Sequence, residues 1–396
     1  MAAPPPVVEV ACRSEFLKFS PPCLGVEEID EVVDTLRSDW ISTGPKVKRF
    51  ESDFGGRVRA PAALALNSCT AALHTALATL GVGPGDEVIT TPITFAASVN
   101  VIEHVGARPV LADVQRDTLN IDPAAVEAAV TSRTRAIIPV HFTGHPVELD
   151  DIETIAHSHG LTVIEDAAHA LPAVYRGRMI GSGRNPVAFS FYATKNLTTA
   201  EGGMLTGEPD FIDRARVLSL HGMSRDAWKR YSKGGSWFYE ILAPGFKYNM
   251  TDLQASIGLQ QLRKLNGFQE RRREIVAFYM EAFGGVEELE LPVEHHDVRH
   301  AWHLFVLRIR PELMRIDRSR FIDELTARNI GTSVHFIPIH LHPFYRYKYG
   351  YVPESFPVAY GEYQRMFSLP LHPGLTRQDI SDVADAVLDV VQRFRR

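Results

Sequence analysis

The sequence predicts an α/β protein in which a large domain, built on a mostly parallel sheet, is followed by a smaller α+β domain. At 396 residues, the chain is longer than one ordinary hydrophobic core needs. Short apolar runs alternate with amphipathic helical segments, which is typical of parallel strands covered on both faces. This alternation ends near residue 250. We therefore expect an N-terminal arm at residues 1–24, the large domain at 25–250 and the small domain at 251–396.

The large domain contains seven apolar runs of strand length. We expect strands at residues 62–66, 87–91, 108–112, 136–140, 161–165, 187–191 and 204–206. Helices are expected before and between them, at residues 25–37, 70–80, 96–105 and 150–158 and after Asp122. In the helix at 70–80, Leu73, Leu77 and Leu80 share one face. Asp122 followed by Pro123 is a typical helix start, with a side-chain cap and a proline at the first helical position.

The small domain has a different pattern. We expect helices at residues 251–265 and 318–328 and strands at 303–308 and 333–336. A C-terminal helix should begin at Thr376, because Asp379 three residues later forms an imperfect capping box with it.

Composition excludes several classes of partner. The formal net charge is −6, and the longest basic run is Arg271–Arg273, so we expect no nucleic acid. The N-terminus lacks the pattern of a secretory signal, and the apolar stretch at 61–83 is interrupted by polar residues, so we expect no membrane segment and a cytoplasmic location. Three cysteines without CxxC spacing argue against disulfides and zinc. His335, His340 and His342 do not follow a zinc spacing either, so we expect no metal site.

Ligands of open parallel sheets lie beyond the carboxyl ends of the strands, so the residues after each strand are the candidates for function. The first strand is followed by small polar residues at 67–73, which open a helix and suit a phosphate. Simple helix capping is the alternative interpretation. Phe95 follows the second strand, where it could lie flat on a planar cofactor or simply belong to the core.

Two charged residues follow later strands. Asp166 lies at a strand's carboxyl end, where it could pair with a buried cation such as a protonated pyridine nitrogen, cap a helix or bind a metal. Lys195 lies between an apolar strand and a loop of small residues, so it is either a desolvated nucleophile or a solvated surface lysine. A phosphate cradle, an aromatic residue, a carboxylate and a lysine in this order together fit pyridoxal phosphate.

Eight stretches of the chain carry a resemblance to a known family. They are residues 40–45, 67–73, 163–169, 189–196, 201–203, 245–252, 334–338 and 368–371. Together they resemble the DegT/DnrJ/EryC1/StrS family of sugar aminotransferases and cover nearly the whole chain. The resemblance implies the aspartate-aminotransferase-like architecture (fold type I), with a seven-stranded sheet in the large domain.

The resemblance also implies roles for individual residues in the cofactor site. Lys195 would carry pyridoxal phosphate and Asp166 would pair with its pyridine nitrogen, which makes these two the catalytic residues. Phe95 would stack on the ring, and His169 would lie near the ring hydroxyl.

Four further residues are implied to hold the cofactor's phosphate. Within one subunit they are Cys69, Thr70 and Ser190. Asn249 would reach the phosphate of the neighbouring subunit's cofactor, so the active unit should be a homodimer with two identical shared sites.

Five residues are implied to lie near the substrate: Thr43, Gly44, Tyr192, Lys247 and His335. At position 192 many relatives have His, so the tyrosine bears on fine specificity rather than on the chemistry. Relatives with His in place of the lysine are dehydratases, and the presence of Lys195 excludes that activity.

The stretch from 221 to 249 looks most like that of members that aminate C4 of a 4-keto-6-deoxy sugar. We expect L-glutamate as the amino donor and a TDP-linked sugar as the acceptor. Three alternatives stay open: a UDP-linked 4-keto sugar, a 3-keto sugar or cyclitol, and a regulatory protein that binds pyridoxal phosphate without turnover.

Overall fold

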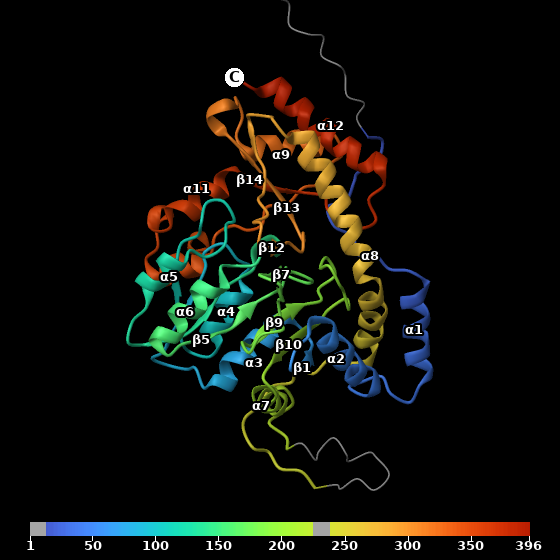
Figure 1. Cartoon of the computed structure of the whole chain (residues 1–396), viewed down its shortest axis with the longest axis vertical. Coiled ribbons are helices and arrows are strands. Elements are labelled where there is room, and N and C mark those ends of the chain that lie inside the picture. Colours follow the sequence, from blue (N-terminus) through green and yellow to red (C-terminus); the bar gives the residue numbers. More distant parts are fainter. Residues whose placement is uncertain (1–12, 225–237) are drawn as a thin grey trace, which may run out of the picture.

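The computed structural model describes residues 13–224 and 238–396 (Figure 1). Residues 1–12 of the expected N-terminal arm, including Cys12, lie outside the described residues. So do residues 225–237, which are part of the stretch that resembles the 4-aminating relatives. No helix in the described ranges is both long and apolar enough to cross a membrane.

Seven strands in the described part of the chain form the central sheet (Figure 1). Their order is β3 (Arg108–Leu111), β2 (Glu87–Thr90), β4 (Thr134–Ile138), β5 with β6 (Thr162–Val163 and Glu165–Asp166), β9 (Val187–Ser190), β10 (Gly203–Gly207) and β1 (Ala62–Leu66). β5 and β6 are successive pieces of one strand, because the Ile164 amide still donates to the Ile137 carbonyl at 2.9 Å and Asp166 bridges to Val140 in parallel. β10 runs antiparallel to both of its neighbours, β1 and β9. The predicted mostly parallel sheet is confirmed.

Helices cover both faces of this sheet. One face packs on α2 (Pro45–Val58), α5 (Pro123–Ala129) and α6 (Leu149–His159), and the other on α3 (Cys69–Leu80), α4 (Ala97–His104) and α7 (Pro209–Ser219). Successive strand residues therefore enter opposite cores: Ile137 packs beside Phe54 and Ile152, and Ile138 packs beside Leu73 and Ile102. This two-sided burial explains why the strands read as continuous apolar runs.

A second core begins on the long helix α8 (Asp252–Phe283), which has 32 residues. Its first half contacts α1 (Val26–Arg37) and α2, and its second half contacts α12 (Arg377–Phe394), as Figure 1 shows. The second core also contains α9 (Arg318–Ala327) and the antiparallel sheet of β11 (Leu289–Glu290), β13 (Phe305–Ile309) and β14 (Met366–Leu369). Because α8 passes through both cores, the domain boundary at residue 250 stays a prediction.

The remaining elements are short. They are the three-stranded sheet of β12 (Val298–Arg299), β7 (Val174–Tyr175) and β8 (Arg178–Met179), and the helices α10 (Pro343–Tyr349) and α11 (Pro357–Arg365).

Two predicted elements differ from the structure. The helix expected at 251–265 continues to Phe283, because buried residues such as Ile275 and Tyr279 carry its apolar face into the second core. The strand expected at 333–336 is wrong: Ser333 exchanges both backbone hydrogen bonds with Ser368, and no strand continues through the neighbouring described residues. This segment therefore pairs with β14 through one residue pair, Ser333 and Ser368.

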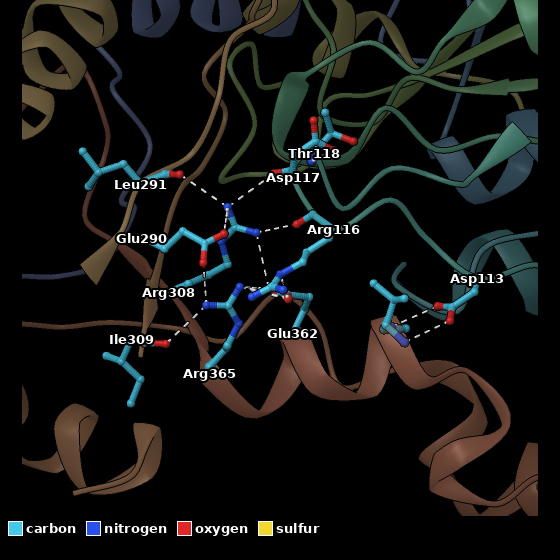
Figure 2. Close-up of polar contacts among 12 residues, drawn as sticks. Asp113, Arg116, Asp117, Thr118, Glu290, Leu291, Arg308, Ile309, Glu362 and Arg365 are labelled. Carbon is cyan, nitrogen blue, oxygen red and sulfur yellow. Dashed lines mark hydrogen bonds and ion pairs between the residues drawn. The ribbon is translucent and has the colours of Figure 1, made fainter. Parts of the chain in front are cut away.

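A buried polar network joins the loop after β3 to the second core (Figure 2). Arg308 of β13 is only 2% exposed, and its guanidinium pairs with Glu290 at 3.0 Å and Glu362 at 3.3 Å. It also donates to the backbone carbonyls of Arg116, Asp117 and Leu291, so its donors reach both sides of the junction. The network therefore fixes the position of the loop relative to β13.

Two neighbouring contacts extend this network (Figure 2). Arg365 pairs with the same two carboxylates, Glu290 at 2.8 Å and Glu362 at 2.7 Å. Asp113 accepts hydrogen bonds from the backbone amides of Val358 and Ala359 in the first turn of α11. The second core is thus held to the loop after β3 by charge-assisted hydrogen bonds as well as by apolar packing.

Arg308→Ala should lower the free energy of unfolding by about 3–5 kcal/mol, because the buried carboxylates would keep their charge and lose a partner. Arg184→Ala is the matched control, since that arginine is exposed and its ion pair with Glu208 spans 3.8 Å. The control should change stability by less than about 1 kcal/mol. Urea titrations followed by circular dichroism measure both changes, and equal effects in the two variants would contradict the role given to Arg308.

Candidate active site

Lys195 lies in the loop between β9 and β10. Its backbone amide donates to the Tyr192 carbonyl at 2.9 Å, which forms a tight turn directly after the strand. The next residue, Asn196, is buried and donates from its side chain to the carbonyls of Leu171 and Ala301, both at 2.9 Å. The loop is therefore tied to two other segments, and the backbone that carries the lysine is held in place.

The environment of Lys195 favours a neutral amine. The side chain is partly buried, and desolvation lowers the pKa of its amine from 10.5 to about 8. The nearby Cys69 and Asp166 act in the opposite direction, because negative charge favours the ammonium form. Of the two interpretations of Lys195, the structure favours the desolvated amine over the solvated surface lysine.

Asp166 ends β6, which is the parallel neighbour of β9. Its carboxylate is buried and accepts a hydrogen bond from Ser98 Oγ at 2.7 Å and another from the Ala168 amide at 3.1 Å. Burial raises the pKa of this carboxyl group, while the two hydrogen bonds and the charge of Lys195 lower it. The sheet thus places a carboxylate and an amine from adjacent strand ends close enough to influence each other.

The predicted phosphate residues gather at the start of α3. Ser68 caps the helix by accepting a hydrogen bond from the Ala71 amide at 3.0 Å, and Cys69 and Thr70 form the first turn. Gly203 is paired with Leu66 on one side and with Ser190 on the other, which brings Ser190 to the same place. A Cβ atom on Gly203 would lie 2.5 Å from the Ser68 carbonyl carbon, so only glycine allows β10 to approach the helix start.

Two aromatic side chains complete the surroundings of Lys195. Phe95 is 64% exposed and contacts Phe336 with a ring-centroid distance of 5.8 Å, so it is not a core residue and its ring can accept a ligand. His169 is buried beside His303, with ring centroids 4.4 Å apart, and burial holds its pKa well below the usual value. Its Nδ1 atom is buried and has no hydrogen-bond partner among the described residues, as expected for an atom that meets a ligand hydroxyl.

His335 lies close enough to Lys195 to feel its charge. Its Nδ1 atom is 2.8 Å from the hydroxyl of Ser368, and burial together with Lys195 lowers its pKa to about 4. Tyr192, another predicted substrate residue, is exposed in the loop that carries Lys195. Tyr192 and His335 thus come to the site from two segments that lie far apart in the sequence.

The other predicted substrate residues form a separate cluster at the edge of β1. Asn249 Nδ2 donates to Thr43 Oγ1, and Lys247 Nζ donates to Asn249 Oδ1, both at 2.6 Å. The Gly44 amide donates to the buried carboxylate of Asp252 at 2.8 Å. Within the described ranges, no hydrogen bond connects this cluster to Lys195 or Asp166 of the same chain. Both polar atoms of the Asn249 amide are thus engaged within this cluster, and its reach to another subunit's cofactor stays a prediction.

Comparison with known proteins agrees with this geometry. The profile of the DegT/DnrJ/EryC1/StrS aminotransferase family matches residues 22–388. The spore coat polysaccharide biosynthesis protein SpsC of Bacillus subtilis (strain 168) is 53% identical over 382 residues, which cover 96% of this chain and 98% of that protein.

The chain belongs to the DegT/DnrJ/EryC1/StrS aminotransferase family. Its solved neighbours include the PMP-form of the putative sugar aminotransferase Spr1654 from Streptococcus pneumoniae, with a TM-score of 0.89 and 36% identity over 95% of this chain and 99% of that one. S. venezuelae DesV in complex with a ketimine intermediate has a TM-score of 0.85 and 35% identity over 93% of this chain and 95% of that one. The protein is thus a pyridoxal-phosphate-dependent aminotransferase of fold type I, as the sequence predicted.

The site fits this cofactor in three independent respects. The start of α3 suits the phosphate, a buried carboxylate suits the ring nitrogen, and the unpartnered His169 Nδ1 suits the ring hydroxyl. In the described residues, no group of three or more His, Cys, Asp or Glu side chains is arranged to hold a metal ion. The roles of the individual residues stay predictions.

Several residues of the site were missed by sequence analysis. Ser98 and Thr94 support Asp166, Asn196 fixes the lysine loop, and His303 and Ser368 orient the two site histidines. Most of them reach the site across large sequence separations, so no local pattern signals them. Ser98 had one usable signal, because it lies in the first turn of a helix that follows a strand end.

The pKa of Lys195 can be tested in the apoenzyme. A pKa of about 8 leaves about a quarter of the amine neutral at pH 7.5, compared with about 0.1% for an ordinary lysine. After reductive methylation with ¹³C-formaldehyde, the Lys195 resonance should titrate with a midpoint near pH 8, the amine being protonated below that value. Lys195→Arg identifies the resonance by its loss, and a midpoint of about 10 or higher would refute the desolvated amine.

Proposed function

We propose that this aminotransferase moves the amino group of L-glutamate to C4 of a nucleotide-linked 4-keto-6-deoxy sugar, with TDP favoured over UDP as the nucleotide. The observation that carries the proposal is the placement of a low-pKa amine, Lys195, beside a buried carboxylate at adjacent strand ends. Support for a sugar acceptor comes from the solved neighbours, which include sugar aminotransferases, and from SpsC, a polysaccharide biosynthesis protein.

When bound, pyridoxal phosphate supplies an aldehyde that exchanges amines and a ring that absorbs carbanion charge. Lys195 Nζ, neutral in a useful fraction near neutral pH, would move a proton from the donor's α-carbon to the aldehyde carbon of the bound cofactor, and in the second half from that carbon to the acceptor's former carbonyl carbon. Asp166 stays ionised opposite the ring nitrogen and holds the proton there. His169 donates or accepts a hydrogen bond at the ring hydroxyl through its unpartnered Nδ1.

The acceptor side of the site is formed by polar and aromatic groups around Lys195. Tyr192 is exposed and offers a flat surface to a sugar ring, and His335 offers its ring within reach of the same space. In the shared site of the proposed homodimer, Lys247 of the separate cluster at the edge of β1, which is exposed and bonded to Asn249, provides a cation suited to a diphosphate. Amination at C3 of a 3-keto sugar, or of a cyclitol, is the second candidate, because the same pocket chemistry serves either carbonyl position.

The substrate proposal is tested with purified enzyme, L-glutamate and a panel of TDP- and UDP-linked 4-keto-6-deoxy sugars. Wild type should release 2-oxoglutarate with a TDP-linked acceptor, and NMR of the product should place the amine on C4. Lys195→Ala should keep its circular dichroism spectrum and lose turnover by about a thousandfold or more. Full activity of Lys195→Ala would refute the catalytic role of Lys195. A product with the amine on C3 would favour the second candidate.

The reconstituted enzyme should absorb in the near-visible, and L-glutamate should bleach this band. Absence of the band or of bleaching would favour a binding protein without turnover.

A shared site in a homodimer makes a separate prediction about subunit mixing. We expect Lys195→Ala dimers to be inactive and Asn249→Ala dimers to bind the cofactor weakly. Mixed dimers of the two variants should contain one site with both native residues, because Asn249 of one subunit serves Lys195 of the other. Titrating separately tagged, purified mixed dimers with pyridoxal phosphate measures this. A single site of wild-type affinity supports the shared site, and uniformly weak sites would show that Asn249 acts in its own subunit.

A further inference from the structure

A chain of three buried polar groups runs into the site from the segment that carries Phe95. Thr94, Ser98 and Asp166 are 2%, 0% and 4% exposed. Thr94 Oγ1 is 2.7 Å from Ser98 Oγ, which is 2.7 Å from Asp166 Oδ2. Both hydrogen bonds join one side chain to another, so they do not stabilise secondary structure. They end on the carboxylate that faces the cofactor.

The direction of the hydrogen bonds in this chain follows from chemistry. An ionised carboxylate has no proton to give, so Ser98 must use its single hydroxyl proton on Asp166. The contact between the two hydroxyls then requires Thr94 to donate to Ser98. Thr94 thereby fixes the orientation of the Ser98 proton, and the Ala168 amide donates to the other carboxylate oxygen at 3.1 Å.

The other groups that face Asp166 do not replace this donor. Lys195 and His141 act on it through charge alone. His141, after β4, accepts the Val147 amide at Nδ1 with a distance of 3.1 Å and therefore directs its Nε2 proton to Glu165, 3.0 Å away. Among the described residues, Ser98 is thus the side chain that hydrogen-bonds the carboxylate against the cost of its burial.

We propose that Ser98, held as a donor by Thr94, is a positioning residue that keeps Asp166 ionised and aimed at the pyridine nitrogen. The inference rests on the proposed function for its cofactor geometry and adds two residues to it. Because Phe95 lies between Thr94 and Ser98, one short segment both covers the ring face and sets the charge opposite the ring nitrogen. Displacing this segment should therefore disturb both contacts together.

The direct test measures the ionisation of Asp166 in the apoenzyme. With ¹³C-carboxyl-labelled aspartate, the Asp166 resonance is assigned by its loss in Asp166→Asn and titrated with pH. Ser98→Ala should raise the Asp166 midpoint by about one unit, a tenfold change in the ionisation equilibrium. Thr94→Val should raise it less, and Thr94→Ser should restore the wild-type value because the hydroxyl is kept.

Cofactor binding provides a second readout. In Ser98→Ala, Asp166 should become protonated at a higher pH than in wild type. Lowering the pH should therefore raise the Kd of this variant for pyridoxal phosphate several-fold more than it raises the Kd of wild type. Ser256→Ala is the matched control, because Ser256 is equally buried but donates to the Leu253 carbonyl on α8. It should change neither the Asp166 midpoint nor the pH dependence of Kd.

The proposal is overturned if Ser98→Ala folds like wild type and leaves both the Asp166 midpoint and the pH dependence of Kd unmoved. These readouts need neither a sugar nor turnover. If no sugar of the panel is aminated but Ser98→Ala still shifts the Asp166 midpoint, the proposed substrate is refuted and the role of Ser98 is supported.

Discussion

The structure depends on keeping a negative charge buried beside an amine. Asp166 is almost inaccessible to water, so its ionised form survives there only because hydrogen bonds and a neighbouring positive group offset the desolvation cost. The same low-polarity surroundings bring the amine of Lys195 toward neutrality. The same burial thus favours the neutral form of both groups, and the hydrogen bonds to Asp166 and the attraction between the two charges act against it.

The sheet supplies this pairing through its topology. β6 and β9 are parallel neighbours, so their carboxyl ends meet at one edge, and β10 returns antiparallel beside β9 to bring Gly203 against the start of α3. The start of α3, a carboxylate and an amine therefore converge from three separate segments of the chain. His335 and Phe336 reach the same place from the segment after α9, and the network around Arg308 holds the second core to the loop after β3.

Most of the central sheet and its key charged residues could be predicted because they depend on local patterns. Apolar runs marked the strands, and Lys195 and Asp166 stood directly after them. The length of α8 could not be predicted, since its continuation depends on packing against a core formed mainly by later elements of the chain, from Leu289 to Val391. Ser333–Phe336 had strand composition, but only one residue pair found a partner. Ser98, Asn196 and His303 act through contacts between distant segments, which a single sequence does not reveal.

The continuity of α8 bears on how acceptor specificity can differ between members of the family. At 32 residues, this helix is a rod about 48 Å long that is shared by both cores. Large hinge closure between the two cores about this helix would require bending the rod. Under the proposed function, discrimination among acceptors would rest on exposed groups beside Lys195, such as Tyr192. Lineages can exchange these groups singly and acquire new acceptors while the scaffold stays the same.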